Sequence, residues 1–209
     1  GRPMKRLLAA GSLGFFLAAL VAATLLTLTY PRGILTVETS GYAEQARHFG
    51  LWQKNPLDWW RPPGFPWCLR LACLAPQPDR VVLWTNFLLF SVNCGLVFLV
   101  GCRVLGRVRW GALLAASFLT CEVLWMQSFF LNLDVTSDAF CAQLLLLSCM
   151  LASLAMAGDS RICWWSACAL AGFLPLLRPA CILLPLAWVL ALRTSRLLYS
   201  GLALLLLCT

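Results

Sequence analysis

Residues 7–29 of the chain read LLAAGSLGFFLAALVAATLLTLT, an apolar run without a single charged residue. As an α-helix this run would be about 35 Å long, which is enough to cross a hydrocarbon core of about 30 Å. The following Tyr30-Pro31-Arg32 adds an interfacial aromatic, a helix breaker and a charge. We therefore predict a first membrane-spanning helix over residues 7–29.

The composition of the whole chain supports the same class. Of its 209 residues, 61% are hydrophobic and only 11% are charged, whereas a soluble domain has about a quarter charged residues. The net charge of +8 would suit nucleic acid in a soluble protein, but here basic residues mark helix ends and no basic run alternates with aromatics. We expect an all-α, polytopic integral membrane protein without a nucleic-acid partner.

Further apolar runs cover residues 81–102, 110–131, 139–157, 162–192 and 197–208. The run 162–192 is too long for one span, and Arg178-Pro179 interrupts it, so we expect two helices there. This gives about seven transmembrane helices in one domain, residues 1–209. The last run offers only about 20 Å of helix, so we expect the chain to be a piece of a longer protein or to be completed by a partner subunit.

Residues 30–80 form the most polar part of the chain, and we expect them to be a long extracytoplasmic loop. Four hydrophobic residues in it fall near helical spacing: Tyr42, Ala46, Phe49 and Trp52. This pattern predicts an amphipathic helix at the membrane surface. The proline-rich stretch 61–66 (RPPGFP) then forbids a continuous helix, and a short or re-entrant helix over residues 67–75 is expected to follow.

The distribution of basic residues orients the chain. With two helices in 162–192, one side of the membrane holds Arg2, Lys5, Arg6, Arg103, Arg107, Arg109, Arg161, Arg193 and Arg196. All of these lie in short loops or tails, which is the pattern of a cytoplasmic face. We therefore predict a cytoplasmic N-terminus and an external long loop.

Under this topology several polar residues gather at the outer surface: Glu38, Tyr42, Arg61, Asp134, Asp138 and Arg178. Ionisable groups near a membrane interior are candidates for function because they are costly to place there. Each also has a structural interpretation. Glu38 could be a solvated loop acid, Arg178 a snorkelling residue, and Asp134 and Asp138 caps of the helix that follows them. Glu122, in the middle of a span, could be a buried acid that is protonated or paired with a neighbouring helix.

Four short motifs, in order along the chain, resemble those of one family. They are residues 38–46 (ETSGYAEQA), 61–66 (RPPGFP), 136–140 (TSDAF) and 172–179 (GFLPLLRP). This ordered set is similar to the GT-C glycosyltransferases, in the branch of protein O-mannosyltransferases and lipid A aminoarabinose transferases. Two positions differ from the usual pattern, with Glu38 in place of an Asp and Asp138 in place of a Glu.

The resemblance implies transfer of a sugar from a polyprenyl-phosphate donor, within the lipids of a bacterial plasma membrane, to an acceptor of unknown identity on the extracytoplasmic face. It implies Glu38 as the catalytic base, Arg178 and Arg61 as ligands of the lipid phosphate, and Tyr42 and Asp138 as substrate-binding residues. No cofactor is required, although Glu38, Asp134 and Asp138 would offer carboxylates to a divalent metal if they converge. The alternative is a non-catalytic membrane subunit or lipid-binding scaffold that retains part of the fold.

Overall fold

The computed structural model describes residues 2–29, 64–72, 74–76, 78–132, 137–158, 160–177 and 181. Every regular element in this part of the chain is a helix, so the all-α class is confirmed for it. The helices are α1 (Arg2–Thr29), α3 (Gly64–Ala72), α4 (Pro78–Val104), α5 (Val108–Asn132), α6 (Ser137–Gly158) and α7 (Arg161–Leu177). The predicted surface helix around residues 42–52 and the runs after residue 181 lie outside the described residues.

Three of the described helices are long and apolar enough to cross a membrane, over Met4–Thr29, Arg80–Val104 and Phe140–Ala157. Arg161–Leu177 is a shorter apolar helix, and α5 is 25 residues long. The predicted spans 7–29, 81–102, 110–131 and 139–157 thus each coincide with a helix. A total of seven spans stays a prediction.

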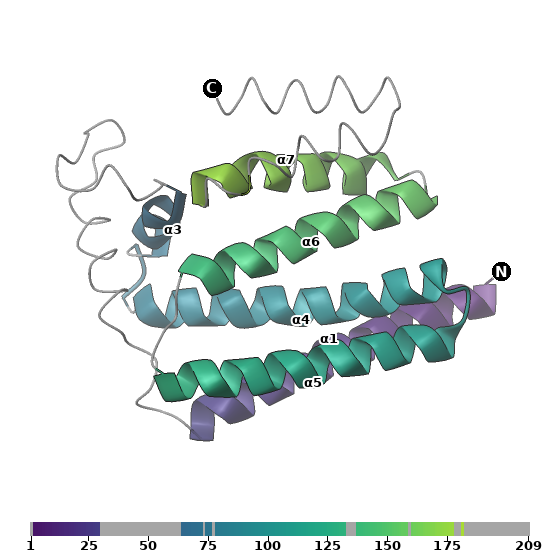
Figure 1. The fold of residues 1–209 in the computed structure, drawn as a ribbon, viewed down its shortest axis with the longest axis horizontal. Coiled ribbons are helices and arrows are strands. Elements are labelled where there is room, and N and C mark those ends of the chain that lie inside the picture. Colours follow the sequence, from purple (N-terminus) through teal and green to yellow (C-terminus); the bar gives the residue numbers. More distant parts are fainter. Residues whose placement is uncertain are drawn as a thin grey trace.

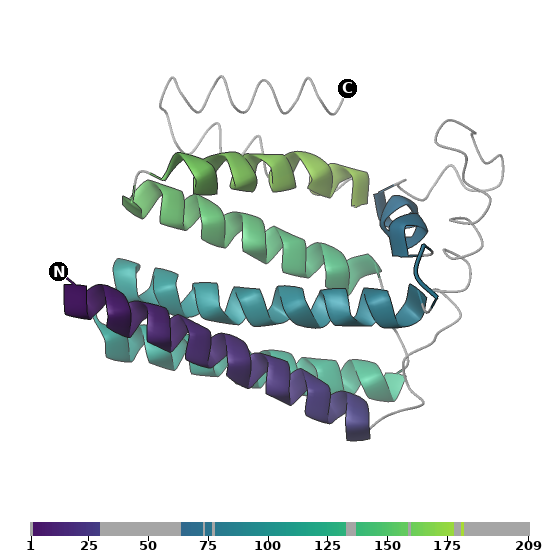
Figure 2. The same cartoon turned by 180° about the vertical axis from the view of Figure 1, so that it is seen from behind.

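The five long helices run side by side, with α4 in the middle (Figures 1 and 2). α1 and α5 pack against one side of α4, α6 packs against the other, and α7 packs against α6. The short α3 lies at the end of the bundle where α4 and α6 begin and where α1, α5 and α7 end (Figure 1). Consecutive long helices therefore alternate in direction, as connections through short turns require.

The turns between the helices follow from local sequence. α4 ends at Val104, and Gly106 takes a φ of 67°, the left-handed conformation that suits glycine after a helix. At the start of α7, the Ser160 hydroxyl accepts a hydrogen bond of 3.4 Å from the Cys163 backbone N–H, as an N-cap does.

The outer surface of the bundle is apolar while polar side chains are found inside. Leucines and a valine at four-residue spacing form an exposed stripe on α1: Leu13, Leu17, Val21 and Leu25. In contrast, Ser91, Asn93, Gln143 and Ser148 are buried. This arrangement suits lipid as the solvent. Exposed leucine is stable in hydrocarbon, whereas polar groups must form their hydrogen bonds within the protein.

A hydrogen-bonded network joins three helices in the interior. Asn93 Nδ2 of α4 donates to Gln143 Oε1 of α6 at 2.7 Å and to the Gln143 backbone carbonyl at 2.9 Å. Gln143 Nε2 donates in turn to Glu122 Oε2 of α5 at 3.0 Å. The pairing of Glu122 with a neighbouring helix, one of the two interpretations open from the sequence, is thereby confirmed.

Small residues let the central helices touch through their backbones. The Ser12 hydroxyl of α1 donates to the Gly95 carbonyl of α4 at 3.1 Å, and a Cβ added to Gly95 would lie 2.9 Å from the Ser12 carbonyl oxygen. Between α4 and α5, a Cβ added to Gly101 would lie 2.9 Å from Gly111 Cα. Such close approach is how membrane helices gain packing energy without a hydrophobic driving force.

Gly111 and Gly14 offer a matched test of this packing, because both lie inside helices. A Cβ on Gly111 would meet the Cys102 backbone nitrogen at 2.7 Å and the Phe98 carbonyl oxygen at 2.9 Å, whereas one on Gly14 meets nothing within 4 Å. We expect Gly111→Ala to lower the free energy of unfolding by about 1–3 kcal/mol through overpacking, and Gly14→Ala to leave it unchanged or slightly raised. Reversible unfolding in mixed micelles, followed by circular dichroism, measures both. Equal stability of the two variants would contradict the close α4–α5 contact.

Candidate functional site

None of the side chains predicted to form the site is described by the structure. Glu38, Tyr42 and Arg61 lie outside the described residues, as does Arg178, which directly follows the end of α7. Asp138 is the second residue of α6, and only its backbone is described. The structure therefore places the helices that carry or flank three of these residues.

Those helices meet at one end of the bundle. α3 packs against both α4 and α7, and the first turns of α6 lie at the same end (Figures 1 and 2). The closest approach involves Gly64, where an added Cβ would lie 2.7 Å from the carbonyl oxygen of Leu176. Gly64 stands three residues after Arg61, and Leu176 stands two before Arg178. The start of α3, which follows Arg61, and the last turn of α7, which precedes Arg178, are therefore in contact.

A second contact brings the chain beyond Arg178 back to α6. The Cys141 and Cys181 sulfur atoms are 3.7 Å apart. Cys141 lies three residues after Asp138, and Cys181 lies three residues after Arg178. Asp138 and Arg178 are thus each three residues in sequence from one partner of this contact.

A compact apolar cluster supports this end of the bundle. It is made of buried side chains from α3, α6 and α7: Leu69, Phe140, Cys141, Leu144, Leu174 and Leu177. Because three helices share it, moving any one of them would open the packing of the other two. The cluster fixes the positions from which the predicted site residues extend.

Prolines lie in and directly after the described part of α7, which reaches Leu177. Arg178 precedes Pro179, and a residue before proline is disfavoured in the helical conformation. Both residues are outside the part of the chain that the structure describes, so the interruption expected there stays a prediction. Pro175 lies inside the helix and has no backbone N–H, so the Ala171 carbonyl lacks its usual helical donor.

α3 differs from its prediction by three residues at each end. The expected helix covered residues 67–75, whereas α3 covers Gly64–Ala72. Pro66 is accommodated because it lies in the first turn, where its missing N–H has no helical acceptor. Burial raises the pKa of the Cys68 thiol, which is free and half-buried. α3 therefore presents a protected thiol close to the apolar cluster.

Helix termini of both kinds occur at this end, where α4 and α6 begin and α1, α5 and α7 end (Figure 1). Their macrodipoles therefore oppose one another, and the bundle as a whole gives this end no single sign of charge. Arginine side chains are the groups from which we expect an anion at this end to gain positive charge. No group of three or more metal-binding side chains occurs among the described residues. Glu38, Asp134 and the side chain of Asp138 are outside that set, so a metal there stays an open expectation.

Two features of this region escaped the sequence-based reasoning. The contact of Gly64 with Leu176 was not foreseen, although the glycine of RPPG was visible as a residue that permits close approach. Nothing in the sequence indicated the contact between Cys141 and Cys181, because the spacing of the two cysteines fits no known ligand or disulfide pattern.

Comparison with known proteins gives one match. A family model described as dolichyl-phosphate-mannose-protein mannosyltransferase matches residues 60–209. The matched part includes Arg61, Asp138 and Arg178, while Glu38 and Tyr42 precede it. No curated protein and no solved structure matches the chain.

The contact between α3 and α7 can be tested through Cys68. We expect Gly64→Ala to push α3 away from the Leu176 carbonyl, expose the Cys68 thiol and lower its pKa towards the ordinary value. Alkylation of Cys68 by a maleimide at neutral pH, located by peptide mass spectrometry, should become severalfold faster. Leu71→Ala is the control, since Leu71 is 70% exposed on the same helix. An unchanged rate in Gly64→Ala would contradict the contact.

Proposed function

Because the chain belongs to the dolichyl-phosphate-mannose-protein mannosyltransferase family, whose members are membrane glycosyltransferases that use polyprenyl-phosphate sugars, we propose that it transfers a sugar from such a lipid to an acceptor hydroxyl at the extracytoplasmic face. The observation that carries this proposal is the family match over residues 60–209. Mannose, the sugar in the family's description, is the first donor to test.

The arrangement of the described helices supports the proposal. The segments that lead to Arg61, Asp138 and Arg178 come from three distant parts of the sequence, and α3, α6 and α7 share one apolar cluster beneath them. An enzyme acting on a membrane-bound donor needs its polar groups at one membrane surface, since they are costly at greater depth. The described segments next to these three residues lie at one end of the bundle, which is compatible with that requirement.

In the proposed reaction Glu38 accepts the proton of the acceptor hydroxyl. A neutral hydroxyl is a poor nucleophile, and a nearby carboxylate removes its proton as the oxygen attacks C1 of the sugar. A bond forms between that oxygen and C1 while the bond from C1 to the phosphate oxygen breaks. The electron pair of the broken bond stays with the lipid phosphate.

Arg178 and Arg61 would bind that phosphate as its negative charge grows. A guanidinium can donate two parallel hydrogen bonds to phosphate oxygens, which gives both charge and orientation. Tyr42 and Asp138 would position the donor and the acceptor. In this scheme the opposed helix dipoles contribute little, so the arginines supply the positive charge.

Glu38 can be tested by replacing its carboxylate with an amide of similar shape. We expect Glu38→Gln to keep donor binding and to lose roughly 10²–10⁴-fold in turnover, the usual range for a lost general base. Glu38→Asp should keep part of the activity, because it retains a carboxylate. Glu44→Gln, in the same loop, is the control. The assay is sugar transfer from a polyprenyl phosphate by the full native protein, and near-normal turnover in Glu38→Gln would favour a non-catalytic membrane subunit.

Arg178 can be tested by measuring donor binding directly. We expect Arg178→Ala to weaken binding of a polyprenyl phosphate by roughly 10- to 100-fold, the range for losing hydrogen bonds to a charged group. Arg178→Lys should restore part of the loss, because it keeps the charge without the paired geometry. Arg193→Ala, predicted to lie on the opposite membrane face, is the control. Equal binding by wild type and Arg178→Ala would remove Arg178 from the donor site.

A further inference from the structure

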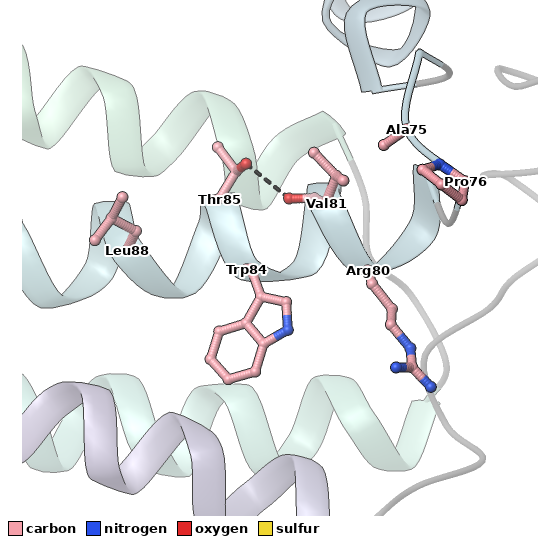
Figure 3. A pocket seen from close by; sticks show the side chains of 7 residues that line it. All are labelled: Ala75, Pro76, Arg80, Val81, Trp84, Thr85 and Leu88. Carbon is pink, nitrogen blue, oxygen red and sulfur yellow. Dashed lines mark hydrogen bonds between the residues drawn. The ribbon is translucent and has the colours of Figure 1, made fainter.

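α4 carries a shallow groove just inside its N-terminal end. The groove has a volume of about 620 Å³ and is lined by Ala75, Pro76, Arg80, Val81, Trp84, Thr85 and Leu88 (Figure 3). Its volume is within the range of small-molecule sites. Two residues of the turn before α4 form one wall, and one face of the helix forms the floor.

The groove is on a face of α4 that does not serve the bundle interior. Successive residues turn about 100° around a helix, so Val81, Trp84 and Leu88 share one face. Val82 and Leu89 lie on another face and pack against the apolar cluster of α3, α6 and α7. The groove is therefore on a different face of α4 from the one that packs against this apolar cluster.

The lining is suited to hydrocarbon. Val81, Trp84 and Leu88 are all exposed, and Trp84 remains 45% accessible. The Thr85 hydroxyl donates to the Val81 carbonyl oxygen at 2.7 Å, so its donor is already satisfied (Figure 3). The groove consequently offers an apolar surface over two helical turns, about 12 Å from Arg80 to Leu88.

Arg80 places a cationic side chain at the N-terminal end of this apolar surface. Arg80 is the first residue of the span Arg80–Val104, which places it at the level of lipid headgroups. Its side chain and that of Trp84 extend to the same side of α4 (Figure 3). Glu122, the one acid whose side chain the structure describes, bonds to Gln143 in the interior and not to Arg80.

We propose that this groove binds an anionic phospholipid of the surrounding bilayer, with the phosphate at Arg80 and one acyl chain along Trp84 and Leu88. The order of groups along the groove matches the order in such a lipid: a cation at headgroup depth, an indole at the interface, then aliphatic side chains. A zwitterionic lipid offers the same chains without net charge, and a soluble phosphate offers the charge without chains. None of the residues that line the groove is among those proposed for the donor site, and this inference does not rest on the proposed function.

Native mass spectrometry of the full chain released from micelles tests the charged contact. Phosphatidylglycerol, phosphatidylcholine and a polyprenyl phosphate are titrated separately. We expect wild type to retain phosphatidylglycerol over phosphatidylcholine, and Arg80→Gln to bind phosphatidylglycerol roughly fivefold more weakly, the effect of one basic residue at an anionic surface. Arg80→Lys should keep most of the binding. Arg70→Gln, also exposed and on α3 at the same end of the bundle, should bind as wild type does.

The apolar contact has its own pair of variants. Trp84→Ala should weaken binding of both phospholipids, because it removes chain contacts common to them. Trp165→Ala, which truncates an indole 61% exposed on α7, should not. Thermal unfolding of each variant in the same detergent confirms that the fold is kept.

Three results would overturn the proposal. Equal phosphatidylglycerol binding by wild type and Arg80→Gln would remove the charged contact. An equal loss in Arg70→Gln would reduce it to general surface charge. Displacement of phosphatidylglycerol by equimolar polyprenyl phosphate would assign the groove to the glycosyl donor instead.

Discussion

Hydrocarbon offers no hydrogen bonds, and the rest of this structure depends on that fact. Backbone groups are satisfied within helices, and several serine and threonine hydroxyls bond to carbonyls one turn earlier, as Thr24 does to Leu20 and Ser153 to Cys149. Other polar side chains bond between helices, as Ser12 does to Gly95 and Asn93 to Gln143. The polar interior and apolar exterior of the bundle follow from this single constraint.

Within lipid, close packing between helices stabilises their association, as the hydrophobic effect does in water. Ser12 with Gly95, and Gly101 with Gly111, bring α1 and α5 into backbone contact with α4. Gly64 plays the same part at the end of the bundle, where α3 meets α7. The same kind of contact therefore assembles the bundle and positions the chain next to Arg61 and Arg178.

The sequence predicted the helices well because uninterrupted apolar runs and proline positions determine them. It placed α3 three residues too late, because Pro66 was taken to exclude a helix that can contain it in its first turn. It did not predict which helices meet. α4 is apolar around most of its circumference, so its sequence does not identify the face towards α6. The site residues came from ordered motifs, and their mutual geometry depends on contacts such as Gly64 with Leu176 that no periodicity encodes.

The network of Asn93, Gln143 and Glu122 also has a consequence for synthesis of the chain. Asn93 precedes its partner Gln143 by 50 residues. At about 5–20 residues per second, roughly 3–10 s pass between the emergence of the two from the ribosome. During this interval the Asn93 amide must bond to water or to another polar group, since lipid provides no substitute. A position of α4 beside the insertion machinery, or in contact with water elsewhere, would satisfy this amide until α6 arrives.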